Sequence, residues 1–137
     1  MLRQRNLKIE FWGDPKINRV SLSARLTYLG IVQYVEDNGV NIASLEQVTY
    51  SLYATDFYHN PQEVKQRVID DIKQLIEQEL IRFYKVEDTY YIYVVDFNEQ
   101  QYIARKSKGH AYPQPVEPVD IECSLEQYEQ LCTMLGV

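Results

Sequence analysis

The feature that most constrains the fold of this chain is a strong helix start signal at residues 60–63. Asn60, Pro61 and Glu63 are residue types favoured at the N-cap, first and third positions of a helix. The apolar residues that follow recur at helical spacing and form one stripe: Val64, Val68, Ile72, Leu75, Ile76 and Leu80. The sequence therefore predicts a long amphipathic helix with a polar outer face.

Two runs rich in aromatic and β-branched residues follow this helix. IRFYKV and YYIYVVDF are separated by Glu87-Asp88-Thr89, a spacing typical of an antiparallel hairpin. Because side chains alternate along a strand, Tyr90, Ile92 and Val94 should share one face, and Tyr91, Tyr93 and Val95 the other.

Two further helices are predicted upstream. Ser21 is suited to cap a first helix that runs to Gly39, with a core face made by Leu22, Leu26, Leu29, Val32 and Tyr34 or Val35. Ser44 has capping-box spacing to Gln47 and predicts a shorter helix that buries Leu45, Val48 and Leu52. Residues 40–42 between them can form only a single edge strand, and SLYATDFYHN shows no clear period.

The order helix, short strand, helix, helix, hairpin is that of a winged helix-turn-helix, an α+β fold. In that fold the third helix enters a DNA groove and the hairpin is the wing. We expect this domain over residues 1–112, then a Pro-containing acidic linker over 113–123. A short capped helix over 124–137 would pack on the domain, on a partner chain or on a further domain.

Composition narrows the class of protein. The 137 residues, 45% of them hydrophobic, allow one core. No long apolar run or signal sequence is present, so we expect a soluble cytoplasmic protein without membrane contact. Cys123 and Cys132 lie on opposite sides of the predicted final helix and far from His59 and His110, which argues against a disulfide, a metal site or any other cofactor.

The net charge of −6 is unevenly distributed, as the sum +4 − 5 + 0 − 5 over residues 1–25, 26–64, 65–116 and 117–137 shows. Two basic clusters stand apart from the acidic middle and tail: Arg3, Arg5 and Lys8, and Arg105, Lys106 and Lys108. The predicted third helix carries five acidic residues against three basic ones, which is unfavourable for groove binding: Glu63, Asp70, Asp71, Glu77 and Glu79 against Lys65, Arg67 and Lys73.

Two stretches resemble the N-terminal winged-helix domains of phage replisome organisers and DnaD-type primosome proteins. The stretch FWGDPKINRVSLSARLTYLGIVQYVEDNGV resembles the opening of those proteins, with its aromatic pair, its Leu-Ser turn, its first helix and its acidic pair before Gly. The stretch LIEQELIRFYKVEDTYYIYVVDFNEQQYIARKSKGHAYPQP is similar to their helix end, wing, Phe-containing exit and basic, Pro-ended linker. The resemblance covers roughly residues 8–115.

The resemblance implies DNA binding in replication initiation, in a bacterial cytoplasm and on a phage or prophage gene. The implied partners are double-stranded origin DNA, possible single-stranded DNA, a replicative helicase or helicase loader, and a possible homo-oligomer. The third helix, the wing and the basic arms would make the contacts: Gln62, Lys65, Gln66, Lys73, Arg82, Arg105, Lys106, Lys108, Arg3 and Arg5. Of the two wing cations, Arg82 is favoured over Lys85 as a phosphate contact.

Alternatives remain for each feature. The glutamines and lysines can simply solvate a helix surface, and the basic arms can be idle linkers. Tyr91, Tyr93 and Tyr102 can stack unpaired bases, or they can pack a tyrosine-rich hairpin. The whole domain can act as a protein-interaction and oligomerisation module that never touches DNA. An enzyme is the least supported class, because no catalytic triad, glycine-rich phosphate loop or paired carboxylates in a pocket can be assembled.

Overall fold

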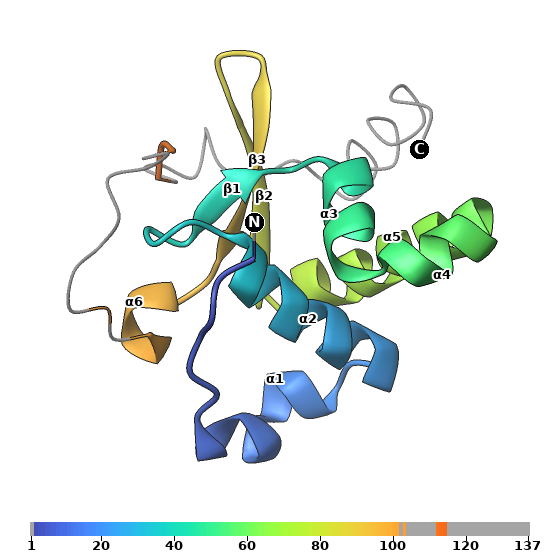
Figure 1. The fold of residues 1–137 in the computed structure, drawn as a ribbon. Coiled ribbons are helices and arrows are strands. Elements are labelled where there is room, and N and C mark those ends of the chain that lie inside the picture. The colour runs from blue at the N-terminus through green and yellow to red at the C-terminus, as the bar shows by residue number, and fades with distance from the viewer. Residues whose placement is uncertain (1, 102, 104–111, 115–137) are drawn as a thin grey trace.

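The computed structural model describes residues 2–101, 103 and 112–114, and these form an α+β domain in which helices pack on a three-stranded antiparallel sheet (Figure 1). The first elements are a 3-10 turn, η1 (Ile9–Gly13), and the short helix α1 (Pro15–Asn18). Neither was expected from the sequence. Asp14 caps α1 by accepting from the backbone N–H of Lys16, and Pro15 occupies its first position.

Helix α2 (Leu22–Tyr34) begins at the predicted Ser21 cap, whose hydroxyl accepts from the N–H of Ala24. The helix ends at Tyr34 and does not run on to Gly39 as predicted, because Val35 is extended and the following residues form a turn. Gly39 has a φ of +84° in that turn, where a Cβ would lie 2.9 Å from Cβ of Phe97. Glycine is therefore required at the entry to β1 and does not end the helix.

The predicted core face of α2 is confirmed at the end of the helix and wrong at its start. Val32, Tyr34 and the following Val35 are buried, but Leu22 and Leu26 are 77% and 59% exposed. The other buried side chains of α2 are Ala24, Thr27, Tyr28 and Ile31. Both faces of this helix carry apolar residues, so the helical period alone did not identify the buried one.

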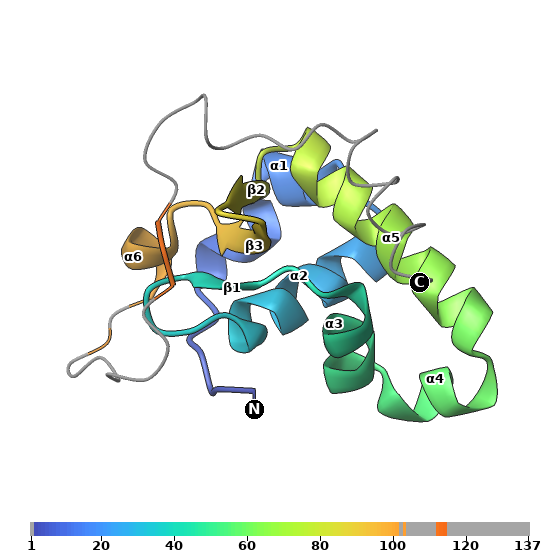
Figure 2. The ribbon, with the colours of Figure 1, turned by 90° about the horizontal axis from the view of Figure 1, so that it is seen from above.

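Strand β1 (Val40–Ile42) is the predicted edge strand and pairs with β3. Helix α3 (Leu45–Leu52) starts at Ser44 as expected, with Ser44 Oγ accepting from the N–H of Gln47. The segment without a clear period contains an additional helix, α4 (Ala54–His59), which lies beside the start of the long helix α5 (Figure 2).

Helix α5 (Pro61–Glu77) confirms the predicted start signal, because Asn60 Oδ1 accepts from the N–H of Glu63. Its buried side includes Val64, Val68, Ile72 and Leu75 and packs mainly against α2. The predicted hairpin is formed by β2 (Ile81–Val86) and β3 (Thr89–Val94). The connection is a two-residue turn, Glu87-Asp88, with both residues at positive φ, so Thr89 already belongs to the strand.

The sheet order is β1-β3-β2, and its helix-facing side buries Ile81, Phe83, Ile92 and Val94. The residues directly after the hairpin, for which no element was predicted, form the short helix α6 (Phe97–Gln100). Residues 112–114 lie back on the domain: Asn38 Nδ2 donates to the carbonyl of Tyr112. The described elements are thus compatible with a small winged-helix-like domain. The predicted linker from residue 115 and the helix over 124–137 lie outside the described residues.

Candidate nucleic-acid interface

The outward face of α5 brings several of the predicted DNA-contacting residues together. Gln62, Gln66 and Lys73 fall on one stripe at helical spacing, together with Asp70 and Glu77. Nε2 of Gln66 donates to Oδ1 of Asp70 over 3.1 Å on the exposed surface. The stripe therefore combines amide groups suited to base edges with one cation and two carboxylates.

Asp71, one of the five acidic residues counted against groove binding, does not face outward. It is 2% exposed and lies between α5 and α2, where it accepts hydrogen bonds from Ser23 Oγ at 2.8 Å and Thr27 Oγ1 at 2.6 Å. The Thr27 hydroxyl also lies 2.6 Å from the Tyr53 hydroxyl. Burial raises the pKa of the Asp71 carboxyl, while the two hydroxyl donors partly offset that rise. Asp71 thus orients α5 on α2 and adds no charge to its outer face.

Lys65 lies on a flank of α5 and faces α4 instead of sharing the stripe. Its Nζ lies 5.6 Å from the ring centroid of Phe57. Arg67, which the sequence did not single out, stacks over Tyr53 at 4.8 Å and forms an ion pair with Asp56 at 3.2 Å. The only sequence signal for these contacts of Arg67 was the presence of aromatic residues before α5. Their position beside Arg67 depends on helix α4, which was not predicted.

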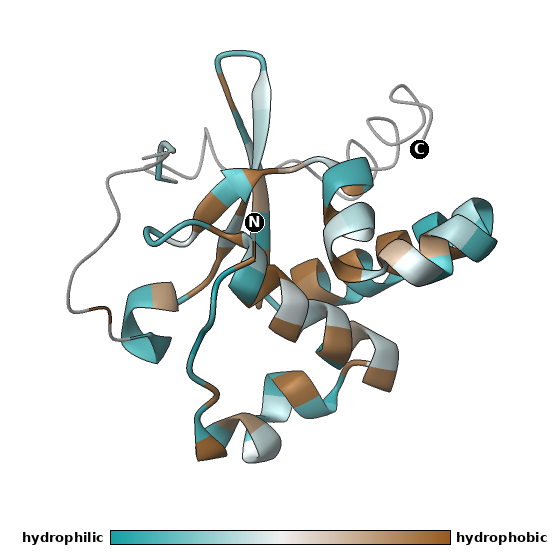
Figure 3. Cartoon of the chain, viewed as in Figure 1, coloured by the Kyte–Doolittle hydropathy of each residue, from teal (hydrophilic) through white to brown (hydrophobic). Residues whose placement is uncertain are grey.

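The two wing cations occupy opposite faces of the hairpin. Arg82 pairs with Tyr93 in the register and is half-buried on the face away from the helices. Lys85 lies beside Tyr90 on the other face, with Nζ 5.5 Å from the ring centroid and 3.8 Å from Oδ1 of Asp88. Arg82 thus lies on the outer sheet face as the alternation implied, and the hairpin tip beyond it is hydrophilic (Figure 3).

The hairpin tyrosines pack against one another. Tyr84 is fully buried, its ring lies 5.7 Å from that of Tyr91, and Tyr91 lies 5.6 Å from Tyr112. The Tyr84 hydroxyl donates to the carbonyl of Pro113. Tyr91 therefore follows the packing alternative, and Tyr102 lies outside the described residues.

The N-terminal arginines are built into the domain and do not form the free basic arm that was expected. The Arg5 side chain is 7% exposed, with Nη1 2.9 Å from Asp37 Oδ1 and Nη2 donating to the carbonyl of Val35 at 2.8 Å. Arg3 pairs with Glu36 at 2.6 Å. The two arginines lie against the domain because their guanidinium groups neutralise the acidic turn after α2. Arg105, Lys106 and Lys108 lie outside the described residues.

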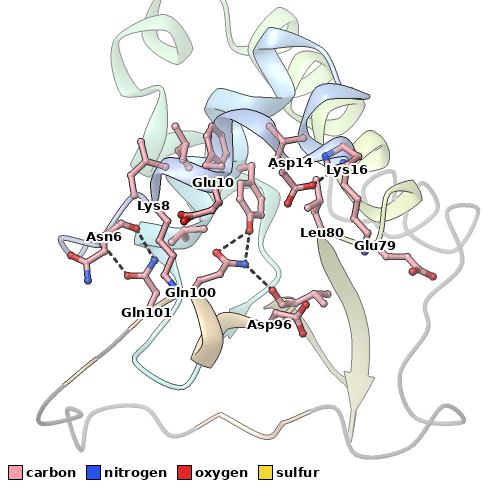
Figure 4. A pocket seen from close by; sticks show the side chains of 18 of the residues that line it. Asn6, Lys8, Glu10, Asp14, Lys16, Glu79, Leu80, Asp96, Gln100 and Gln101 are labelled. Atoms are coloured by element: carbon pink, nitrogen blue, oxygen red, sulfur yellow. Dashed lines mark hydrogen bonds between the residues drawn. The ribbon is translucent and has the colours of Figure 1, made fainter.

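A separate cavity of about 470 Å³ lies between the N-terminal segment, α2 and α6 (Figure 4). Its apolar floor includes Phe11, Leu29 and Leu80, and at one end the Tyr28 hydroxyl pairs with the Gln100 amide. Charged residues of both signs line its sides: Lys8, Glu10, Asp14, Lys16, Arg19, Glu79 and Asp96.

Within residues 2–101, 103 and 112–114, no three or more His, Cys, Asp and Glu side chains are grouped to hold a metal ion. None of the helices in this part of the chain combines the length and apolar character needed to cross a membrane. Comparisons with protein families, with curated proteins and with solved structures found no match. The resemblance to replisome organisers therefore rests on the two stretches of sequence quoted above.

Proposed function

We propose that this chain is a winged-helix domain that binds duplex origin DNA during replication initiation, with α5 in the groove and the β2–β3 hairpin as the wing. The order of elements and the sheet order β1-β3-β2 support this proposal. The observation that carries it is the stripe Gln62, Gln66 and Lys73 on a capped helix that Asp71 ties to α2. A rigidly held helix with amide groups on its open face is suited to base-edge contacts.

Each contact has a chemical role in this proposal. Gln66 would exchange its bond to Asp70 for a paired hydrogen bond to adenine, worth about 1–3 kcal/mol of discrimination between bases. Lys65 and Lys73 would neutralise phosphates on either side of the groove, and Arg82 would do so from the wing. Arg105, Lys106 and Lys108 remain proposed backbone contacts, whereas Arg3 and Arg5 are left out because the acidic turn occupies them.

The charge of the stripe sets an expectation for affinity. Asp70 and Glu77 repel phosphates, and few cations lie near α5, so we expect only a few phosphates to be neutralised. Binding should then be modest at physiological salt, and its logarithm should fall with the logarithm of salt with a slope of about −0.9 for each phosphate contacted.

Fluorescence anisotropy with labelled duplex DNA, including repeat-rich origin fragments, tests this proposal at about 50 and about 200 mM salt. Lys65→Ala combined with Gln66→Ala should weaken binding about tenfold or more. Arg19→Ala is the matched control, because it removes an exposed cation from the end of α1. Absence of duplex binding at the lower salt, or equal losses in the control, contradicts the proposal.

A second candidate function, a protein-interaction module of the primosome, is favoured by the exposed leucines of α2. Leu22 and Leu26 lie one turn apart on α2, are 77% and 59% exposed, and do not belong to the core cluster of the described residues. A replicative helicase, its loader or a second copy of this chain would cover them. Leu26→Glu should abolish any self-association seen in sedimentation velocity while leaving duplex binding unchanged. Cytoplasmic location and the absence of catalysis remain predictions.

A further inference from the structure

An uncharged aromatic hollow adjoins the start of α5. It is open, has a volume of about 640 Å³ and is lined by residues of α3, α4 and the start of α5, three helices whose arrangement Figure 2 shows. The described residues that line it are uncharged: Tyr50, Ala54, Thr55, Phe57, Tyr58 and Pro61. Tyr58 is 84% exposed and Tyr50 is 64% exposed, so two large ring faces are in contact with water.

The rings are arranged around a partly buried centre. Phe57 packs against the core and meets Tyr50 edge to face, with the centroids 6.3 Å apart. Tyr58 meets His59 edge to face at 5.6 Å. The Phe57 ring thus anchors the hollow, and the faces of Tyr50 and Tyr58 stay open at its rim.

One cation lies beside the hollow on the α5 side. Nζ of Lys65 lies 5.6 Å from the Phe57 centroid. Asp56 is paired with Arg67, whereas Glu63 keeps its negative charge, because the Asn60 amide that donates to its Oε2 at 3.0 Å is neutral. Glu46, one turn before Tyr50, is a second opposing charge, on α3. An occupant with a flat uncharged face and a single negative group beside Lys65 therefore fits the hollow.

We infer that this hollow binds an unpaired DNA base, which stacks on Tyr50 or Tyr58 while Lys65 neutralises the adjacent phosphate. The inference rests on the proposed function and deepens it, because Pro61 directly precedes Gln62 of the duplex-contacting stripe. Every base has a π face, so stacking on exposed aromatic side chains tolerates any sequence. The domain would thereby prefer duplex DNA that contains a short opened region over intact duplex.

The exposed rings are found at α3–α4 and not on the hairpin, where stacking had first been suggested. Tyr91 is already packed between Tyr84 and Tyr112. A base could reach that site only by displacing residues 112–114, whereas the faces of Tyr50 and Tyr58 need no displacement.

The test uses three labelled probes: a duplex, the same duplex with a central bubble of unpaired thymines, and oligothymidine. The parent chain should bind the bubble duplex more tightly than the intact one. Combining Tyr50→Ala with Tyr58→Ala should weaken bubble binding about tenfold and leave duplex binding unchanged. The Tyr→Phe variants at both positions keep the rings and should bind like the parent.

Trp12→Ala, which removes another exposed ring from η1, is the control and should have no effect on any probe. Equal affinity of the parent for bubble and intact duplex overturns this inference but leaves the proposed function standing. Loss of bubble binding in the Phe variants as well overturns stacking, and unchanged bubble binding in the Ala variants overturns the assignment of the hollow as the base-binding site. A parent that binds no probe at low salt overturns both proposals.

Discussion

Two groups of polar and charged side chains in this domain differ in how far they are bonded within the domain. Arg3 and Arg5 at the N-terminus are paired with Glu36 and Asp37 in the turn after α2. On the outward stripe of α5, Gln62, Gln66, Asp70 and Glu77 are instead exposed, and the Gln66 amide donates to Asp70 on the surface. The arginines stabilise the fold, whereas these four side chains are accessible to solvent.

Asp71 shows the same difference within a single helix. It is a residue of α5, but its side chain is bonded inside the domain, as those of Arg3 and Arg5 are. Its neighbour Asp70 is exposed, while Asp71 accepts from Ser23 and Thr27 beneath the helix. One residue of helix rotation, about 100°, separates the exposed charge of Asp70 from the buried carboxyl of Asp71. A count of acidic residues per helix is therefore a poor measure of its outer charge.

The largest expected effect is that of Asp71→Ala. This change removes the carboxylate that accepts from the partly buried Ser23 hydroxyl and the buried Thr27 hydroxyl, and Thr27 keeps only its contact with the Tyr53 hydroxyl; it should lower the free energy of unfolding by about 2–3 kcal/mol. Urea denaturation measures the loss. Asp70→Ala is the matched control on the exposed side and should stay within about 0.5 kcal/mol. Equal small effects at both positions would remove the distinction between the two carboxylates.

Arg5→Ala should come next, with a loss of about 2 kcal/mol, because the side chain is nearly buried and Asp37 loses its 2.9 Å ion pair and keeps the longer one, at 3.6 Å, with Arg3. Arg5→Lys should restore little of that loss, since an ammonium does not reproduce the guanidinium contacts to Asp37 and the carbonyl of Val35. Arg3→Ala, at the more exposed pair, should cost about 0.5 kcal/mol in the same denaturation experiment. A full rescue by Lys would show that charge alone matters here.

The stability of the domain should depend on pH through the buried carboxyl of Asp71. The pKa of Asp71 is raised in the folded state by burial, so between the unfolded and folded pKa values the folded state binds more protons. Its contribution to stability is therefore complete below the unfolded pKa and decreases as pH rises through the folded pKa. Asp71→Asn should make stability fall less over that window than in the parent, as measured by thermal melts. An unchanged profile would contradict the raised pKa.

The smallest effect is expected from Asp70→Asn. Removing this carboxylate from the outward stripe should tighten duplex DNA binding about two- to fivefold. This change in affinity corresponds to a relief of electrostatic repulsion of between a few tenths of a kcal/mol and about 1 kcal/mol. Stability should not change measurably. Anisotropy at low salt, where repulsion is least screened, provides the measurement. Weaker or unchanged binding would indicate that the stripe does not face DNA.

Local signals predicted most of the elements. The caps at Ser21, Ser44 and Asn60 and the two aromatic runs depend on hydrogen bonds and propensities within a few residues, and the structure contains each of them. Helix α4 was missed because its six residues carry no periodic pattern, and it is held in place by α3 and α5. Leu22 and Leu26 were wrongly assigned to the core because both faces of α2 carry apolar residues.

For the candidate site, the sequence by itself determined which residues lie on the long helix and its wing: Gln62, Gln66, Lys73 and Arg82 occupy the positions that helical and strand periods assign. Only the tertiary structure decided which charges remain available. In the folded domain Asp71 is buried, Lys65 lies beside the Phe57 ring and Arg5 is paired with Asp37. Tyr50 and Tyr58 line an open hollow there. The physical reason is that ion pairs, burial and ring contacts join residues far apart in the chain, and no local period records which partner a side chain will meet.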